Sequence, residues 1–121
     1  MALVHKGKIP KGDVLACAKI AGIMAAKNTH QMIPMCHPLP IQWIDLNFTL
    51  NEAKNQIEME SEVKLEARTG AEMEALVAVT SAALTIYDMC KGIDKEMEIS
   101  EICILRKSGG RSGTYLRKSR K

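Results

Sequence analysis

The chain has 121 residues, 46% of them hydrophobic and 26% charged, which is enough for one domain with a buried core and ordinary for a soluble globular protein. The net charge of +3 is uneven, because residues 111–121 hold five basic groups and no acid, whereas the remainder carries 12 basic and 14 acidic groups. That body, with few aromatic residues, lacks the features of a nucleic-acid-binding surface. We predict one domain over residues 1–121, with an N-terminal stub (1–10) and a basic tail (114–121).

The sequence shows no pattern of a secretory signal or a membrane span. No apolar run reaches about 18 residues, and no basic, apolar and small-residue succession opens the chain. The cysteines have no Cys-x-x-Cys spacing, so we expect reduced thiols in a cytoplasmic protein without a membrane partner. They are Cys17, Cys36, Cys90 and Cys103.

A first helix is predicted from Val14 to Lys27. Asp13 precedes it as an N-cap, and Asn28 is a suitable place for it to end. Small side chains on this segment leave room for another backbone to pack closely against it. They are Ala16, Ala18, Ala21, Gly22 and Ala25.

A stiff connector and two strands follow the first helix. Three prolines among residues 34–40 exclude a helix or a central strand from the connector. Apolar and polar residues then alternate from Ile44 to Leu50 and from Ile57 to Leu65, which predicts two half-buried strands. The polar residues 51–56 between them favour a hairpin.

The stretch Thr69–Lys91 predicts a long helix that carries charge only at its two ends. Glu72 and Glu74 lie in its first turns, and no residue from 75 to 87 carries a formal charge. Asp88 and Lys91 share one face at the far end, because they are three residues apart. The acidic end lies about 24 Å from Asp88 along the helix axis, so both ends cannot serve one small site within a single chain.

Residues after the long helix predict a third strand and a basic loop. Apolar residues alternate from Met97 to Ile104, with a change of phase near Ser100 that we interpret as a bulge. The order helix–strand–strand–helix–strand is that of an α+β ferredoxin-like sandwich with its first strand absent or vestigial. Residues 2–9 are a candidate for a stub of that strand. Otherwise an upstream segment or another chain would complete the sheet.

Each candidate for chemistry also has a structural interpretation. Cys36-His37 lies between prolines, where the imidazole is either an acid/base group or an ordinary surface histidine. No second Cys/His pair has zinc-ligand spacing, so we expect no metal site. Glu72 and Glu74 either contact a ligand or compensate the helix dipole.

The remaining candidates also have both a functional and a structural interpretation. Asp88 and Lys91 form either a proton-transfer pair at a rim or a surface ion pair. Residues 107–113 are either an anion-binding loop, with Lys107 and Arg111 facing phosphate oxygens, or a glycine-rich tail. Lys11, just before the first helix, fits the same anion-binding interpretation.

Several motifs occur in an order that resembles one enzyme family from about Val4 to Gly113. They are Lys11-Gly12-Asp13-Val14, Ile20-Ala21-Gly22-Ile23, Ile33-Pro34-Met35-Cys36-His37-Pro38-Leu39, Thr69-Gly70-Ala71-Glu72-Met73-Glu74-Ala75-Leu76, Ala83-Leu84-Thr85-Ile86-Tyr87-Asp88-Met89-Cys90-Lys91 and Lys107-Ser108-Gly109-Gly110. The chain thereby resembles the cyclic pyranopterin monophosphate synthases, the C proteins of molybdenum cofactor biosynthesis.

The resemblance implies a ferredoxin-like subunit in a hexamer, a trimer of dimers with active sites between subunits. It implies a lyase that rearranges a 3′,8-cyclised dihydro-GTP to cyclic pyranopterin monophosphate and releases pyrophosphate. Asp88 corresponds to the catalytic aspartate and Lys91 to its partner lysine. The positions corresponding to substrate-binding residues are Met35, Cys36, His37, Glu72, Met73, Glu74, Lys11 and Lys107.

The resemblance requires no resident cofactor or metal, although Mg²⁺ could accompany the substrate triphosphate. Family members usually carry a few dozen residues, including a strand, before the stretch that matches Val4. Two alternatives therefore stay open beside the enzyme. The chain could be a truncated, non-catalytic assembly subunit of the same family. A small basic RNA-binding module fits less well, because the exposed strand positions hold Asp, Asn, Thr and Glu rather than aromatic residues.

Overall fold

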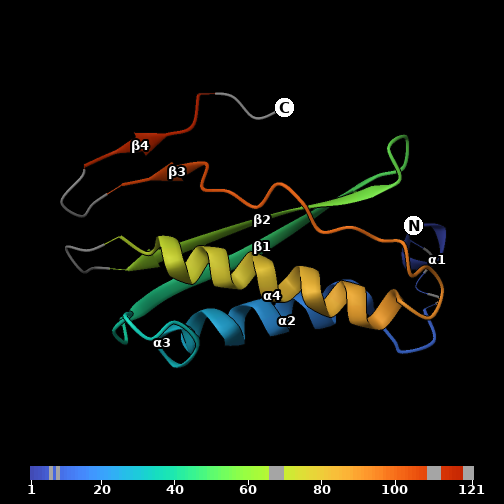
Figure 1. The fold of residues 1–121 in the computed structure, drawn as a ribbon, viewed down its shortest axis with the longest axis horizontal. Coiled ribbons are helices and arrows are strands. Elements are labelled where there is room, and N and C mark those ends of the chain that lie inside the picture. The colour runs from blue at the N-terminus through green and yellow to red at the C-terminus, as the bar shows by residue number, and fades with distance from the viewer. Residues whose placement is uncertain (6, 8, 66–69, 109–112, 119–121) are drawn as a thin grey trace.

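The structure, a computed structural model, describes residues 1–5, 7, 9–65, 70–108 and 113–118. It is an α+β protein with antiparallel strands, as expected from the sequence (Figure 1). Its helices are α1 (Ala2–His5), α2 (Val14–Lys27), α3 (Thr29–Met32) and α4 (Glu72–Cys90). Its strands are β1 (Ile41–Asn51), β2 (Gln56–Leu65), β3 (Arg106–Lys107) and β4 (Tyr115–Leu116).

Helix α2 begins and ends at the predicted residues. The Asp13 side chain caps it by accepting a hydrogen bond from the backbone N–H of Ala16 at 3.1 Å. Asn28 is its C-cap, as expected. The short helix α3 was not predicted; it follows at once, and its first residue, Thr29, is buried and donates its hydroxyl to the Ala26 carbonyl at 2.8 Å.

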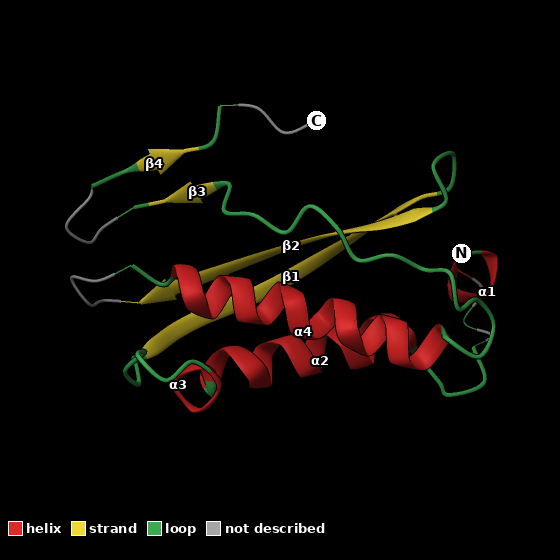
Figure 2. Ribbon diagram, viewed as in Figure 1, coloured by secondary structure: helices red, strands yellow, loops and turns green. Residues whose placement is uncertain are grey.

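Strands β1 and β2 form the predicted hairpin. They pair antiparallel along almost their whole length, with Leu46 opposite Ser61 and Phe48 opposite Met59. The alternating apolar residues Ile44, Phe48, Ile57 and Met59 face the helices, and Leu46 is almost fully buried there, whereas Trp43 is exposed. Helices α2 and α4 cover this face together (Figures 1 and 2). The opposite face carries the polar residues of the alternation.

Close contact between α2 and α4 depends on small residues. Ala18 of α2 and Ala78 and Ala82 of α4 have no exposed surface. A Cβ atom built on Gly22 would lie 2.6 Å from Leu46 Cδ1 and 2.8 Å from the Ala78 carbonyl oxygen. The glycine therefore lets α2 approach both the backbone of α4 and the sheet.

Helix α4 confirms the predicted uncharged core helix, with a later start. Thr69 lies outside the described residues, and the N-cap is Ala71, which makes no side-chain cap. By length and composition alone, α4 is the one helix in the described chain that could cross a membrane, although the core helix of a soluble protein passes the same test. Since it packs against both α2 and β2, we interpret it as a core helix.

The predicted third strand is wrong. Residues 97–105 form no ladder, and Glu101 has a positive φ of 57° where the phase of the alternation changes. The proposed first-strand stub is also wrong, since residues 2–5 are helical. The error at residues 97–105 has a topological cause. In a split βαβ sheet the first strand lies between the strands that here are β2 and residues 97–105, so without it the latter have no neighbour to pair with.

The basic C-terminal tail is partly folded. Tyr115 and Leu116 pair with β3, and Arg117 donates its Nε–H to the Ile104 carbonyl at 2.7 Å. Its backbone N–H also bonds to the Leu105 carbonyl at 2.8 Å. Most of the predicted glycine-rich loop, residues 109–112 with Arg111, lies outside the described residues.

Replacing Gly22 with alanine should destabilise the fold by roughly 1–3 kcal/mol, the usual cost of overpacking a dense core. The added methyl group would meet the backbone of Ala78, which cannot turn away as a flexible side chain could. Gly92→Ala is the matched control, because a Cβ at Gly92 meets nothing within 4 Å. Urea unfolding followed by circular dichroism measures both variants. Equal midpoints for the two variants would contradict the packing argument.

Candidate active site

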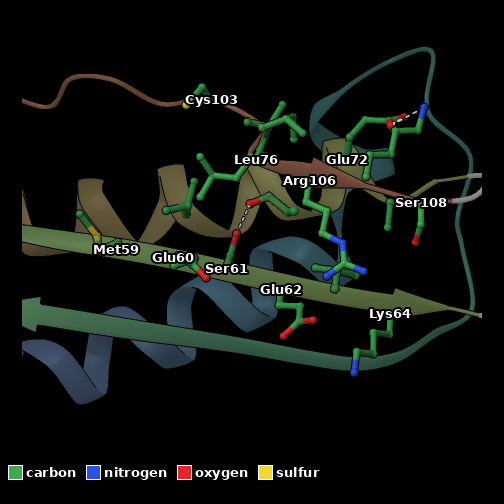
Figure 3. A pocket seen from close by; sticks show the side chains of 17 residues that line it. Met59, Glu60, Ser61, Glu62, Lys64, Glu72, Leu76, Cys103, Arg106 and Ser108 are labelled. Atoms are coloured by element: carbon green, nitrogen blue, oxygen red, sulfur yellow. Dashed lines mark hydrogen bonds and ion pairs between the residues drawn. The ribbon is translucent and has the colours of Figure 1, made fainter. Parts of the chain in front are cut away.

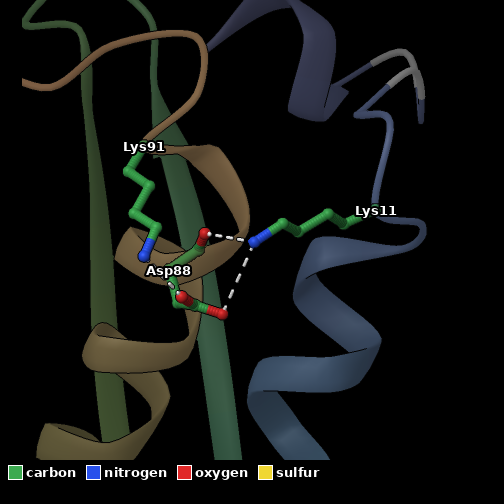
Figure 4. A network of polar contacts seen from close by, with 3 residues as sticks. All are labelled: Lys11, Asp88 and Lys91. Carbon is green, nitrogen blue, oxygen red and sulfur yellow. Dashed lines mark hydrogen bonds and ion pairs between the residues drawn. The ribbon is translucent and has the colours of Figure 1, made fainter.

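Two charged clusters lie at opposite ends of α4, and the first gathers around Asp88. Lys91 Nζ lies 3.1 Å from one Asp88 carboxylate oxygen, and Lys11 Nζ lies 3.8 Å from the other (Figure 4). Lys11 also donates a hydrogen bond to the Asp88 carbonyl at 3.1 Å. Because α2 and α4 run antiparallel, the turn before α2 brings Lys11 to the last turn of α4. The cluster is exposed to solvent.

The two lysines determine the electrostatics of Asp88. A carboxylate in the last turn of a helix faces the negative end of the helix dipole, which by itself disfavours ionisation. The Lys91 ammonium, by hydrogen bonding, and then the Lys11 charge hold the pKa of the Asp88 carboxyl below its usual range. The site therefore presents an ionised carboxylate between two ammonium groups that can each donate a proton.

The second cluster lies where α4 begins. Lys107 Nζ of β3 lies 2.8 Å from a Glu72 carboxylate oxygen, and both side chains are only partly exposed. They line a pocket of about 500 Å³ between β2, the first turns of α4 and residues 103–108 (Figure 3). Arg106 lines the same pocket and extends across it toward β2 in Figure 3. Lys107, which is paired with Glu72, and Arg106 thus both face an open cavity.

The remaining predicted site residues lie toward this second end. Glu74 is buried with 4% of its surface exposed, whereas Met73 beside it is partly exposed. Met35, Cys36 and His37 lie in the connector after α3, at the end of the molecule where α4 starts (Figure 1). Met35 is 90% exposed and His37 is also exposed, so this loop presents its side chains outward.

In the structure, Lys11 and Lys91 lie beside Asp88, and Lys107 lies beside Glu72. These two groups of residues lie at opposite ends of α4. The spacing in the sequence predicted the contact between Asp88 and Lys91. It did not predict the contact of Lys11 with Asp88 or that of Lys107 with Glu72. Arg106 was also missed as a lining residue of the pocket. Its position directly before Lys107 in the sequence was the available signal.

Neither cluster offers a ready metal centre. Over the part of the chain that the structure describes, no group of three His, Cys, Asp or Glu side chains is placed to hold a metal ion. The four cysteines are free thiols, and burial raises the pKa of the Cys90 thiol. The groups available for chemistry are carboxylates, ammonium groups, thiols, a guanidinium and an imidazole.

The family model described as "MoaC family" matches residues 1–110. The chain belongs to the MoaC family. It is 60% identical over 114 residues to the cyclic pyranopterin monophosphate synthase of Thermoanaerobacter pseudethanolicus, and 58% identical over the same length to that of Heliobacterium modesticaldum. It is 54% identical over 117 residues to that of Chloroflexus aurantiacus. The matches cover 94–97% of this chain and 72% of each of the three relatives.

Membership of the MoaC family covers both clusters. The matched residues 1–110 include Lys11, Asp88 and Lys91 at one end of α4, and Glu72 and Lys107 at the other. The MoaC-family match also includes the exposed connector after α3. Curated relatives that share these residue ranges are named cyclic pyranopterin monophosphate synthases, so both clusters lie in the part of the chain that is similar to an enzyme.

In this MoaC-family chain, Lys91→Met should raise the pKa of Asp88 toward its ordinary value, because the nearest ammonium is lost. Lys11→Met should raise it by a smaller amount, since that ammonium is 3.8 Å away. A carbon-13 NMR titration of the Asp88 carboxyl measures both changes. The sign for stability follows: the pairing stabilises the fold above the unfolded-state pKa, and that contribution is lost as pH falls through the depressed pKa.

Lys19→Met is the control for this titration. Lys19 lies 3.1 Å from Asp45 and, as its hydrogen-bond partner, lowers the pKa of that carboxyl. Removing Lys19 should raise the pKa of Asp45 and leave the Asp88 midpoint where it was. An Asp88 midpoint that does not move in Lys91→Met would show that the contact does not persist in solution.

Proposed function

We propose that this chain is a cyclic pyranopterin monophosphate synthase of molybdenum cofactor biosynthesis. It converts (8S)-3′,8-cyclo-7,8-dihydroguanosine 5′-triphosphate to cyclic pyranopterin monophosphate and pyrophosphate. The observation that carries the proposal is a match to the MoaC family over residues 1–110 that includes Asp88 together with Lys91 and Lys11, both of which contact it. A carboxylate held ionised beside two ammonium groups suits a rearrangement that needs repeated proton transfers.

Asp88 is the proton acceptor in this proposal and Lys91 its donor. Opening of the purine ring and closure of the pyrazine ring each move protons between nitrogen and oxygen atoms of the substrate. An ionised carboxylate can accept such a proton, and an ammonium 3.1 Å from it can return one. Lys11 helps to keep Asp88 ionised at the start of the cycle.

The cations at the other end of α4 suit the triphosphate. A sugar hydroxyl forms a new bond to the α-phosphorus while the bond from that phosphorus to the bridging oxygen breaks. Pyrophosphate leaves and the hydroxyl proton passes to a base. Lys107 and Arg106 would neutralise the charge that develops on the phosphoryl oxygens. His37, Cys36 and Met35 in the exposed connector, with Met73 and the acidic pair Glu72 and Glu74, complete the proposed substrate contacts.

A homo-oligomer reconciles the two distant clusters. If one active site takes the Asp88 end of α4 from one copy and the Lys107 end from another, each copy contributes to two sites. The outer face of the helix layer supports such contacts, because Ile20 and Met24 of α2 are each 59% exposed and Leu84 of α4 is 56% exposed. Leu84 lies one turn before Asp88, so a covering subunit would reach the first cluster. We propose the hexamer that the family resemblance implies.

The proposal needs no resident cofactor, and any Mg²⁺ would arrive bound to the substrate triphosphate. We place the enzyme in the cytoplasm, which agrees with the free thiols of its cysteines. Its partners in this proposal are the small-molecule triphosphate and further copies of itself, with no nucleic acid or membrane.

Asp88→Asn should reduce pyrophosphate release from the cyclised substrate by at least about 100-fold, because it removes a general base. Asp45→Asn is the matched control: this aspartate also pairs with a lysine and also has a lowered pKa, but it lies on β1, away from both clusters. Turnover is followed by coupled detection of pyrophosphate, with circular dichroism and native mass as checks on folding. A wild-type rate in Asp88→Asn would refute the role of Asp88 as the general base. An inactive wild-type chain would refute the proposed synthase activity.

A mixing experiment tests the shared site. Asp88→Asn and Lys107→Met should each be inactive alone, whereas mixed subunits should recover activity at about one quarter of the sites, those that receive both intact ends under random assortment. Native mass spectrometry confirms that subunits have exchanged. Exchange without recovery would overturn the proposal that one site takes its two ends from different subunits.

A further inference from the structure

Thr29 is a buried polar residue that no step of the proposed reaction uses. Over the part of the chain that the structure describes, only Thr29 and Glu74 are polar and buried, and Glu74 is already among the proposed substrate contacts. Thr29 is 1% exposed. Burial of a hydroxyl is costly unless it forms a hydrogen bond, and this hydroxyl donates to the Ala26 carbonyl at 2.8 Å.

This hydrogen bond lies where the chain changes direction between α2 and α3. Asn28 separates the two helices with φ −116° and ψ 22°, outside the α-helical region, so α2 ends there. The last carbonyls of a helix need partners from outside it. Here the Asn28 side chain donates to the Met24 carbonyl at 2.9 Å, and Thr29 donates to that of Ala26. Only the Thr29 bond is buried, so it is the one that is shielded from water.

Backbone hydrogen bonds continue from Thr29 into the connector, residues 33–40. The Ile33 N–H donates to the Thr29 carbonyl at 2.9 Å, and the Cys36 N–H donates to the Ile33 carbonyl at 3.0 Å. His37 precedes a proline, which restricts its backbone to extended conformations. The path from the buried hydroxyl to His37 therefore contains few free torsions.

The connector has little packing of its own to hold it in place. Met35 is 90% exposed, His37 is exposed, and Cys36 is only partly buried. Helix α3, in contrast, packs against α4 at the end of the molecule where α4 begins (Figure 1). A change in the direction of α3 at Thr29 would therefore move His37 relative to the first turns of α4.

We propose that Thr29 is a positioning residue for substrate binding. Its buried hydroxyl fixes the direction of α3 and thereby holds Met35, Cys36 and His37 at the substrate. This rests on the proposed function, in which those three side chains contact the substrate. Thr29 itself does not touch it. Loss of the hydroxyl should therefore weaken substrate binding more than the proton transfers at Asp88.

Two substitutions of Thr29 separate its hydroxyl from its size. Thr29→Val removes the hydroxyl and keeps the branched shape, whereas Thr29→Ser keeps the hydroxyl. In assays of pyrophosphate release, Thr29→Val should raise KM about tenfold and change kcat by less than about twofold. Thr29→Ser should stay close to wild type in both. Equal effects of the two substitutions, or a fall in kcat alone, would overturn the proposal.

A double-mutant cycle with His37→Ala distinguishes positioning from general destabilisation. If Thr29 acts through the connector, Thr29→Val should have a clearly smaller effect on KM once the His37 side chain is absent, about threefold rather than tenfold. Effects that simply add would show that the two residues act independently, and would overturn the proposal.

Hydrogen exchange tests the same hydroxyl without substrate. The amides of Ile33 and Cys36 should exchange at least about tenfold faster in Thr29→Val than in wild type or Thr29→Ser. Thr85→Val is the matched control, because Thr85 also donates its hydroxyl to a helical carbonyl, that of Ser81, at 2.8 Å. It should leave both amides unchanged. Unchanged exchange in Thr29→Val would overturn the proposal.

Failure of the synthase proposal would give a different result. An inactive wild-type chain would refute the synthase activity and, with it, the role of Thr29 at the substrate. The expected exchange rates in the same chain would still establish that the Thr29 hydroxyl holds the connector in place.

Discussion

The close approach of α2 and α4 at Gly22 is the constraint on which the rest of the structure depends. Because the glycine has no Cβ, the backbone of α4 and the Leu46 side chain can both reach α2. This contact fixes how far the two antiparallel helices slide past each other. The turn before α2 then falls opposite the last turn of α4, where Lys11 meets Asp88. The packing of α2 against α4 therefore also sets the geometry of the candidate site.

Elements encoded by nearby residues could be predicted from the sequence. Asp13 as an N-cap set the start of α2, and the alternation of Ile57–Leu65 gave β2 and its buried face. Patterns of this kind depend on neighbours within a few positions. The segment 97–105 shows the opposite case, because its apolar alternation needs a neighbouring strand that the hairpin does not supply. A strand pattern gives a propensity, and only a partner turns it into a ladder.

The contacts of the candidate site are likewise of two kinds, those between neighbours in the sequence and those between distant residues. The Asp88–Lys91 pair follows from a spacing of three residues on one helix, and the sequence predicts it. The contacts of Lys11 with Asp88 and of Lys107 with Glu72 join residues from different elements, and no local pattern carries them. The family motifs indicated that all five residues matter but not which of them touch. Packing provides that information, and it separates the Asp88 cluster from the Glu72–Lys107 cluster at the opposite end of one helix.

The sequence separations of these contacts also have a consequence for folding kinetics. The hairpin closes through neighbours such as Asn51 and Glu58, seven residues apart, whereas Lys11 and Asp88 are 77 residues apart. Short loops close at a lower entropic cost than long ones, so the hairpin can form while the helix pair is still open. The Asp88 cluster is then among the last features to assemble. The part of the lowered pKa of Asp88 that comes from Lys11 therefore reports on the completed tertiary fold, whereas the part that comes from Lys91 reports on helix α4 alone.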